Sequence, residues 1–353
     1  MTQSPYSNRP ANRFWRSAVA ETSPLELRDI YKKRWDIEPD WQIATAGSCF
    51  AQHIARYMRS SGYKVLDVEP KPNGLPDALA PQFGYQIYSA RYGNIYTARQ
   101  LLQLVREAVD GDRPADLAWE KDGRFFDSQR PNIEPNGFDS TAELLDHRAY
   151  HIAQVRRMLT EMDLLVFTLG LTETWQHTSS GTVFPTAPGT IAGQFDPALY
   201  HFRNFTFAEV HQDLCEVFNI LDRLRDKPLH VMLTVSPVPL TATAEERHVL
   251  QSSTYSKSVL RAVAGQIQAE RENVDYFPSY EIVTNPAARG VFYAANLRSV
   301  TSAGVDTVMK SFFAAHGSET PAPKADTAHI DTADEGDGDD VICEDAMLEA
   351  FGK

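Results

Sequence analysis

The sequence predicts an α/β fold with a mainly parallel central sheet. Short apolar runs alternate with longer amphipathic segments over most of the chain, which is the pattern of repeated strand–helix–strand units. The run 164–169 is apolar throughout, as expected of a central strand that is buried on both faces. The chain has 353 residues, enough to bury such a sheet in one large domain or two smaller ones.

Local signals mark where these elements begin and end. Thr97 follows a loop of aromatic and polar residues and can cap a helix that runs to about residue 108. Asp122-Gly123 is a turn signal that predicts a hairpin inside an insertion at about 110–140. In chain order, the expected elements are a strand at 43–46, a helix from 50, a strand at 63–66, a helix at 97–108, a hairpin at 119–127, a helix at 140–161, strands at 164–169 and 230–235, a helix at 255–270, an extended run at 274–280 and a last helix at 305–313.

The acidic charge of the chain is concentrated at its C-terminus. The formal net charge is −13, and residues 317–353 hold eleven acidic residues against two lysines. The body, 1–316, is therefore nearly balanced and has no basic stripe, which argues against nucleic-acid binding and favours a small or neutral ligand. The composition of the tail predicts disorder. Its tip, 341–351, has an apolar stripe that either docks to a protein partner or arises by chance.

Cysteine content and hydropathy bound the class of protein further. The three cysteines, Cys49, Cys215 and Cys343, are far apart and form no CxxC pair, so neither a disulfide framework nor a zinc site is expected. Residues 1–16 lack an apolar signal segment, and no run approaches the roughly 20 apolar residues of a membrane span. We therefore expect a cytoplasmic protein without a membrane span, cofactor or metal.

The segment Gly47-Ser48-Cys49-Phe50-Ala51 joins the first expected strand to the first expected helix. Glycine permits a tight turn there, and a serine at this point is aimed outward at the end of the sheet. The free N–H groups of the helix start can stabilise an oxyanion, so the geometry is that of a nucleophile. The alternative is that Ser48 only caps the helix, as serine often does.

Polar residues follow the other central strands too. Thr172 and Glu173 come just after 164–169, and Ser236 follows 230–235. Because the carboxyl ends of parallel strands line the ligand crevice of an open α/β sheet, these side chains and Ser48 are expected to converge.

Four separated motifs, taken together, resemble the GSCFA family. They are 47–51, 92–97, 169–173 and 276–281, and the resemblance spans about 11–315. The family is similar to the SGNH or GDSL hydrolases, which implies a three-layer α/β/α domain over 1–316 that brings together a serine, oxyanion donors and a histidine. The resemblance also favours Ser48 as a nucleophile over Ser48 as a cap.

The resemblance implies a role for several other residues. The backbone N–H of Ser48 would be the first oxyanion donor, and Gly93 would supply the second. Gly170 and Thr172 fall on the Gly-x-Asn motif of the superfamily, so the Thr172 hydroxyl would replace an amide donor. Asn94, expected to be exposed in its loop, is an equal candidate for that third donor, or else a simple turn residue.

The chain departs from the family pattern at its last block. There the resemblance implies an aspartate and, three residues later, a histidine, but this sequence has Asn296 and Ser299. Neither can act as a base near neutral pH. Any histidine that activates Ser48 must therefore come from another segment.

The remaining candidates for a base differ in their position. His53 points away from Ser48 around the helix and is expected to pack. His177 follows the 169–173 motif, while His248 lies in the loop after Ser236 near two glutamates, and either can reach the crevice. His248 is slightly preferred, although a loop histidine is commonly just solvated. Glu173 is a further candidate base, or else an ion-pair partner of Arg298, and Cys49 is expected to point inward as an apolar filler.

The leading hypothesis is a serine esterase or O-acyltransferase that acts on a carbohydrate or glycoconjugate through an acyl-enzyme on Ser48, for example in polysaccharide biosynthesis. The carbohydrate preference comes from the resemblance. The main alternative is a catalytically impaired protein that keeps the fold and binds a glycan or an acylated ligand. A third hypothesis places the function in the acidic tail as a module that binds a protein partner.

Overall fold

The structure is a computed structural model that describes residues 4–317. Contacts divide these residues into two units: a larger one with 38–276, and a smaller one with 4–37 and 277–317. The predicted disordered tail and its apolar tip lie outside the described residues.

A parallel sheet of four strands forms the centre of the larger unit. Its order is β1 (Ile43–Gly47), β4 (Leu164–Leu169), β8 (His230–Val235) and β9 (Val274–Tyr276), and every neighbouring pair is parallel. All the residues of β1 and β4 are buried, as their apolar composition predicts. The predicted mainly parallel α/β fold is thereby confirmed.

The predicted strand at 63–66 is reduced to a single bridge. Val65 pairs in parallel with Ile43, and Leu66 donates its N–H to the Ile43 carbonyl at 2.8 Å. The chain then leaves the sheet edge, where Val68 donates its N–H to Ser89.

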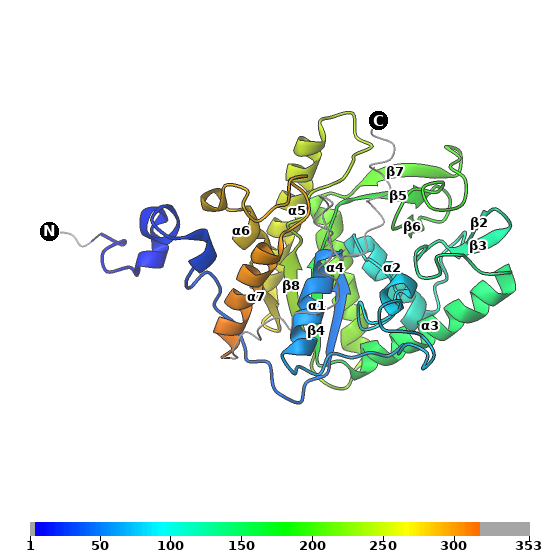
Figure 1. Cartoon of the computed structure of the whole chain (residues 1–353), viewed down its shortest axis with the longest axis horizontal. Helices are drawn as coiled ribbons and strands as arrows, with labels where there is room; N and C mark the ends of the chain where they lie inside the picture. Colours follow the sequence, from blue (N-terminus) through cyan, green and yellow to red (C-terminus); the bar gives the residue numbers. More distant parts are fainter. Residues whose placement is uncertain (1–3, 318–353) are drawn as a thin grey trace, which may run out of the picture. The chain divides into compact units, whose positions relative to one another are not determined.

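Helices flank the sheet (Figure 1), namely α1 (Phe50–Ser60), α2 (Ala98–Asp110), α3 (Thr141–Glu161), α4 (Phe207–Leu224) and α5 (Val249–Glu270). The hydroxyls of Thr97 and Ser140 accept backbone N–H groups in the first turns of α2 and α3, as N-caps do. Helix α5 begins six residues before the predicted start, and α4 was not predicted although a capping box at Thr206 and Glu209 opens it.

Two antiparallel sheets accompany the central one. The predicted hairpin is confirmed as β2 (Ala118–Lys121) and β3 (Arg124–Asp127), with Asp122 and Gly123 both at positive φ in its turn. The second sheet was not predicted, and its order is β6 (Val183–Phe184), β5 (Glu173–His177) and β7 (Tyr200–Asn204).

The smaller unit is helical. It contains α6 (Ser279–Thr284) and α7 (Ser302–His316), together with the short turns η1 (Ala11–Arg13), η2 (Arg16–Ala20), η3 (Pro24–Glu26) and η5 (Pro286–Ala288); η4 (Ala80–Phe83) belongs to the larger unit. No helix within residues 4–317 is long and apolar enough to cross a membrane.

Candidate active site around Ser48

Three central strands deliver polar residues to one edge of the sheet. Gly47 at the end of β1 pairs with Thr168 of β4, and Leu169 pairs with Val235 of β8. The residues that follow these strands therefore meet at the same edge, and Ser236 donates its backbone N–H to the Leu169 carbonyl at 2.8 Å. The carboxyl ends of β1, β4 and β8 thus lie at one edge of the sheet, and the convergence of the Thr172 and Glu173 side chains with Ser48 stays a prediction.

The turn at Gly47 fixes the position of Ser48. Gly47 has φ +134°, and a Cβ at this position would lie 2.4 Å from the Thr168 carbonyl oxygen, so only glycine fits. Ser48 donates its own backbone N–H to that carbonyl at 3.1 Å. This N–H completes the ladder between β1 and β4, so the implied role of Ser48 N–H as the first oxyanion donor is not supported by its geometry.

The side chain of Ser48 is buried and makes no hydrogen bond. The residue is 2% exposed, and its Oγ has no hydrogen-bond partner among the described residues. Cys49, not Ser48, is the N-cap residue of α1, and no side chain caps this helix. Two expectations are therefore wrong: Ser48 is not aimed outward into solvent, and it does not cap the helix. Cys49 is buried at 6% exposed, in agreement with its expected role as a filler.

Gly170 touches Ser48 directly. A Cβ on Gly170 would lie 2.8 Å from the Ser48 Cβ and 3.0 Å from the Tyr96 carbonyl oxygen. The Gly170 N–H donates to that same carbonyl at 3.1 Å, which holds the loop before α2 against the end of β4. The contact that the structure shows for Gly170 is steric: the absence of a side chain at this position leaves room for the Ser48 side chain.

We expect Gly170→Ala to destabilise the fold by about 1–3 kcal/mol, the usual cost of overpacking, because Ser48 and Tyr96 are both held by backbone contacts. Chemical denaturation measures the effect. Gly74→Ala is the control, since no heavy atom lies within 4 Å of its added Cβ, and it should change stability by less than about 0.5 kcal/mol. Equal stability of the two variants would contradict the close contact at Gly170.

Asn94 lies beside Ser48 but is not exposed as the sequence suggested. It is 3% exposed, and its Oδ1 accepts hydrogen bonds from the Tyr88 hydroxyl at 2.6 Å and from Gln52 at 3.1 Å. The same Tyr88 oxygen lies 3.0 Å from the Ser48 carbonyl oxygen. The loop residue before it, Gly93, is half-buried with φ +67°. Tyr88 and Gln52 were not found from the sequence, because they lie outside the quoted motifs.

Thr172 belongs to a chain of polar contacts with Asn204 and Glu245. Its hydroxyl donates to Asn204 Oδ1 at 2.7 Å, and Asn204 donates in turn to Glu245 at 3.0 Å. The Thr172 N–H donates to the Ser256 hydroxyl at 3.0 Å. Because both donors of Thr172 are engaged, its hydroxyl can serve an oxyanion only if the bond to Asn204 is given up.

Glu173 is the carboxyl group of this region with the most altered acidity. It begins β5, is 9% exposed, and accepts a hydrogen bond from the Thr243 hydroxyl at 2.9 Å. Burial raises its pKa to about 7, the Thr243 bond opposes this shift, and the charge of Glu245 adds to it. A carboxyl group that titrates near neutrality can exchange protons in either direction under ordinary conditions.

The three candidate histidines make contacts of other kinds. His248 is exposed and is the N-cap of α5, where its Nδ1 accepts the Leu250 N–H at 3.1 Å. His177 ends β5, four residues or about 13 Å along the strand from Glu173, and its Nδ1 lies 3.0 Å from the Ser180 hydroxyl. His53 packs edge-on against the Phe50 ring, as expected. None of them is among the hydrogen-bond partners of Ser48 within residues 4–317.

Lys257 was missed by the sequence reasoning. It lies on α5, is 3% exposed, and donates from Nζ to the Gly170 carbonyl at 2.8 Å. The Lys257 ammonium group therefore contacts the same residue that packs against Ser48. A signal was present: Lys257 shares a helical stripe with Leu260, Ala264 and Ile267, all fully buried, and a lysine on such a stripe needs a specific partner.

The last sequence block forms a closed turn in the smaller unit. The Oδ1 of Asn296 accepts the backbone N–H groups of Arg298 and Ser299, both at 2.9 Å, and its amide donates to the Ser299 hydroxyl at 3.1 Å. The two residues at the positions where the resemblance implies an aspartate and a histidine are thus paired with each other. Asn296 here has the turn-forming role that is typical of asparagine.

A buried charged cluster lies behind the loop that carries Asn94. We define it as Glu69, Glu107, Asp127, Arg130, Arg148 and His151, all at most 8% exposed. Asp127 accepts from Arg130 at 2.7 Å and from Arg148 at 3.0 Å, while Arg148 also pairs with Glu107.

The buried charged cluster forms hydrogen bonds to the backbone of the loop before α2. Glu69 accepts the Arg91 N–H at 2.6 Å, and Arg130 donates to the Arg91 carbonyl at 3.3 Å. Burial and the charge of Arg130 lower the pKa of His151 to about 4, so the neutral ring donates from Nδ1 to Glu69 at 2.7 Å. The sequence did not reveal the cluster because its members come from four separate segments.

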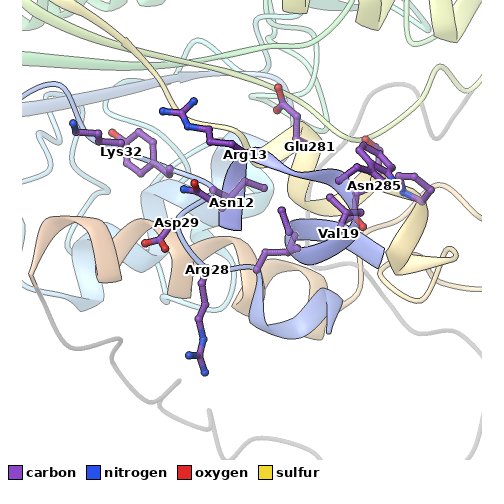
Figure 2. A pocket seen from close by; sticks show the side chains of 15 residues that line it. Asn12, Arg13, Val19, Arg28, Asp29, Lys32, Glu281 and Asn285 are labelled. Carbon is purple, nitrogen blue, oxygen red and sulfur yellow. The ribbon is translucent and has the colours of Figure 1, made fainter. Parts of the chain in front are cut away.

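The smaller unit contains a separate cavity of about 830 Å³, which Figure 2 shows from close by. Its wall carries the cationic side chains of Arg13, Arg28 and Lys32 and the acidic Asp29 and Glu281. The volume is in the range of small-molecule sites, but no residue predicted for the site lines it.

The chain was compared with models of known families and with curated proteins. No protein among the curated sequences matches it. The model of the GSCFA family matches residues 42–312, a span that begins just before β1, includes Ser48, Asn94 and Gly170, and ends within α7. The match covers more than three quarters of the chain, and the chain therefore belongs to the GSCFA family.

Proposed function

We propose that this protein is a serine-dependent acyl-transfer enzyme, an esterase or O-acyltransferase that forms an acyl-enzyme on Ser48. One observation carries the proposal: the Ser48 hydroxyl is buried without a hydrogen-bond partner among the described residues, at a strand-to-helix turn that only glycine can form. A buried polar group is nearly always bonded, so an unpaired one calls for a functional explanation.

The surroundings of Ser48 support this chemistry. The first turn of α1 follows directly, and helix N-termini stabilise negative charge. Gly93 and Asn94 lie on the loop beside the serine, and we propose them as the groups that hold the reacting carbonyl group. Gly170, whose N–H already donates to Tyr96, is a weaker candidate for this role. Because the Thr172 hydroxyl already donates to Asn204, it is a weaker candidate for this role than the sequence suggested.

The step that activates Ser48 requires a group that removes its proton. Glu173, three residues after Gly170, is our preferred base, because its pKa of about 7 suits proton transfer near neutral pH. Lys257 donates to the Gly170 carbonyl and is proposed as a positioning residue that fixes the loop in contact with Ser48. His248 and His177 remain proposals, and neither ring is a hydrogen-bond partner of the Ser48 hydroxyl within the described residues.

The raised pKa of Glu173 predicts a pH-dependent stability. The group binds its proton more tightly in the folded chain than in the unfolded chain, where its pKa is about 4.3. Its contribution is therefore fully present below pH 4, is lost as the pH rises through 7, and is flat above pH 8. Relative to Glu173→Gln, the wild-type free energy of unfolding should fall on the order of 1–3 kcal/mol between pH 4.5 and 8.

The control for this measurement is Glu246→Gln, an exposed side chain on the loop after β8. This variant should follow the wild-type pH dependence throughout. If Glu173→Gln also showed the wild-type pH dependence, the Glu173 carboxyl group would not have a raised pKa. The reason for preferring Glu173 as the base would then be removed.

The substrate class is proposed as a carbohydrate or glycoconjugate that carries an acyl group. This choice follows from the family resemblance and not from a defined sugar contact. The direct test is to treat the purified protein with a fluorophosphonate, which reacts with activated serines, and to locate the adduct by mass spectrometry. An adduct on Ser48 is expected, and a clean failure to label would contradict the acyl-enzyme.

A second candidate function is the binding of a glycan or acylated ligand without turnover. The observation that favours it is the paired Asn296 and Ser299, which lack the acid–base chemistry of the family's aspartate and histidine. In that case an acyl-sugar should bind to the protein unchanged, with no acyl group released or transferred over many hours.

A further inference from the structure

Three side chains with metal-ligating atoms meet on two packed helices, away from Ser48. His211 and Cys215 are four residues apart on α4, and therefore share a face, and Glu270 is the last residue of α5. One ligand atom from each lies within 4.8 Å of the others. The His211 Nε2 is 2.8 Å from Glu270 Oε2, and the Cys215 Sγ is 3.9 Å from the same nitrogen.

These separations are close to those of a zinc site. With Zn–S of about 2.3 Å and Zn–N or Zn–O of about 2.0–2.1 Å, tetrahedral ligand atoms lie about 3.3–3.6 Å apart. The sulfur lies 3.8 Å from His211 Nδ1 and 3.9 Å from Nε2, so it must move toward the Nε2 side of the ring, and the carboxylate must move out from Nε2 by about half an ångström. These changes require side-chain rotations, which are open to His211 and Glu270 because their side chains are only partly buried, at 25% and 38% exposure.

Neighbouring side chains hold two of the three ligands in place. Gln266 donates to Glu270 Oε1 at 2.6 Å, which leaves the other carboxylate oxygen facing His211. The Phe207 ring stacks on the His211 ring at 12° between planes, with centroids 5.9 Å apart. Outer contacts of this kind orient metal ligands and raise affinity. Arg271, whose charge also acts on the thiol, is ion-paired with Asp222 at 2.5 Å.

We propose that His211, Cys215 and Glu270 bind one Zn²⁺ ion, with solvent in the fourth position, and that the ion joins α4 to α5. The donor set of one nitrogen, one sulfur and one oxygen suits a borderline-soft divalent ion better than Ca²⁺ or Mg²⁺. When the ion binds, Cys215 loses its thiol proton to solvent. One thiolate and one carboxylate then balance the two positive charges, and His211 binds as the neutral ring.

The test uses tag-free full-length protein that has been stripped with a chelator and titrated with Co²⁺. We expect one equivalent to bind and to give a sulfur-to-cobalt charge-transfer band, which one equivalent of Zn²⁺ abolishes. Cys215→Ser should lose the band, and His211→Ala should weaken binding at least 10-fold. Zn²⁺ should also raise the melting temperature of the wild type but not of Cys215→Ser.

Two variants serve as controls. Cys49→Ala removes the other described thiol, and His201→Ala removes a histidine on β7, and both should keep the band. The proposal is overturned if the wild type shows no thiolate band at one equivalent of Co²⁺. It is equally overturned if Cys215→Ser binds as the wild type does, since the metal would then lie at another site and the three residues would form an ordinary surface ion pair.

Discussion

Ser48→Ala is expected to abolish covalent labelling by a fluorophosphonate and to lower acyl-transfer activity by about 10⁴-fold or more. The reason is chemical: without Oγ there is no atom to carry the acyl group, and loss of a serine nucleophile costs this much in comparable enzymes. Labelling followed by mass spectrometry measures the first effect, and turnover of activated acyl esters measures the second.

The same variant should not destabilise the fold. The Ser48 hydroxyl is buried and has no described hydrogen-bond partner, so its removal takes away a desolvated polar group without breaking a bond. We expect the free energy of unfolding to stay equal or rise by up to about 1 kcal/mol. A serine kept for a structural hydrogen bond would give the opposite result, because loss of a hydrogen bond costs about 1 kcal/mol.

Ser236→Ala is the matched control at the same edge of the sheet. Ser236 is also buried and follows a central strand, but its Oγ accepts the Val238 N–H at 3.2 Å. This variant should lose about 1 kcal/mol of stability and keep its labelling. Labelling that persists in Ser48→Ala, or a loss of stability there like that of Ser236→Ala, would contradict the nucleophile.

The elements that the sequence predicted correctly are those that local patterns determine. The apolar run of β4 and the turn signal at Asp122-Gly123 each specify a structure within a few residues. The same holds for Ser48: a strand, a glycine and a helix start are all adjacent in the chain. For this reason the sequence located the serine, although not its burial.

The parts that could not be predicted depend on contacts between distant segments. Lys257 reaches Gly170 across 87 residues, and the Thr172 hydroxyl meets Asn204 across 32. Nothing in either local pattern specifies these partners, because they follow from how α5 and β7 pack within the larger unit. The exposed loop expected at Asn94 was wrong for the same reason: Tyr88 and Gln52 cover it.

Asp127→Ala is expected to cost about 3–5 kcal/mol of stability, the usual effect of removing one partner from a buried ion pair. Asp127 lies at the centre of the buried charged cluster, with a fully buried side chain. Burial alone would raise its pKa, but Arg148 and Arg130 hold that pKa well below the usual range of a carboxyl group. Without the carboxylate, the Arg130 side chain, 1% exposed, loses its ion-pair partner and stays shielded from water.

The surface pair of Arg157 and Glu161 provides the matched control. It also joins an arginine to a carboxylate at 2.8 Å, but the side chains are 57% and 39% exposed. Glu161→Ala should therefore cost less than about 1 kcal/mol, since exposed pairs contribute little. Urea denaturation of both variants measures the difference.

The buried charged cluster also connects stability to the site. Arg130 donates to the Arg91 carbonyl, and Asn94 follows three residues later, so loss of Asp127 should loosen the loop beside Ser48. In Asp127→Ala we expect slower fluorophosphonate labelling of Ser48 even where the protein remains folded, because oxyanion donors act only when they are held in place. If Asp127→Ala lowered the stability as little as Glu161→Ala does, the charges of the cluster would have to be solvated, and other contacts would have to hold the loop. If Asp127→Ala were destabilised but labelled at an unchanged rate, the cluster would contribute to the stability of the fold and not to the reaction at Ser48.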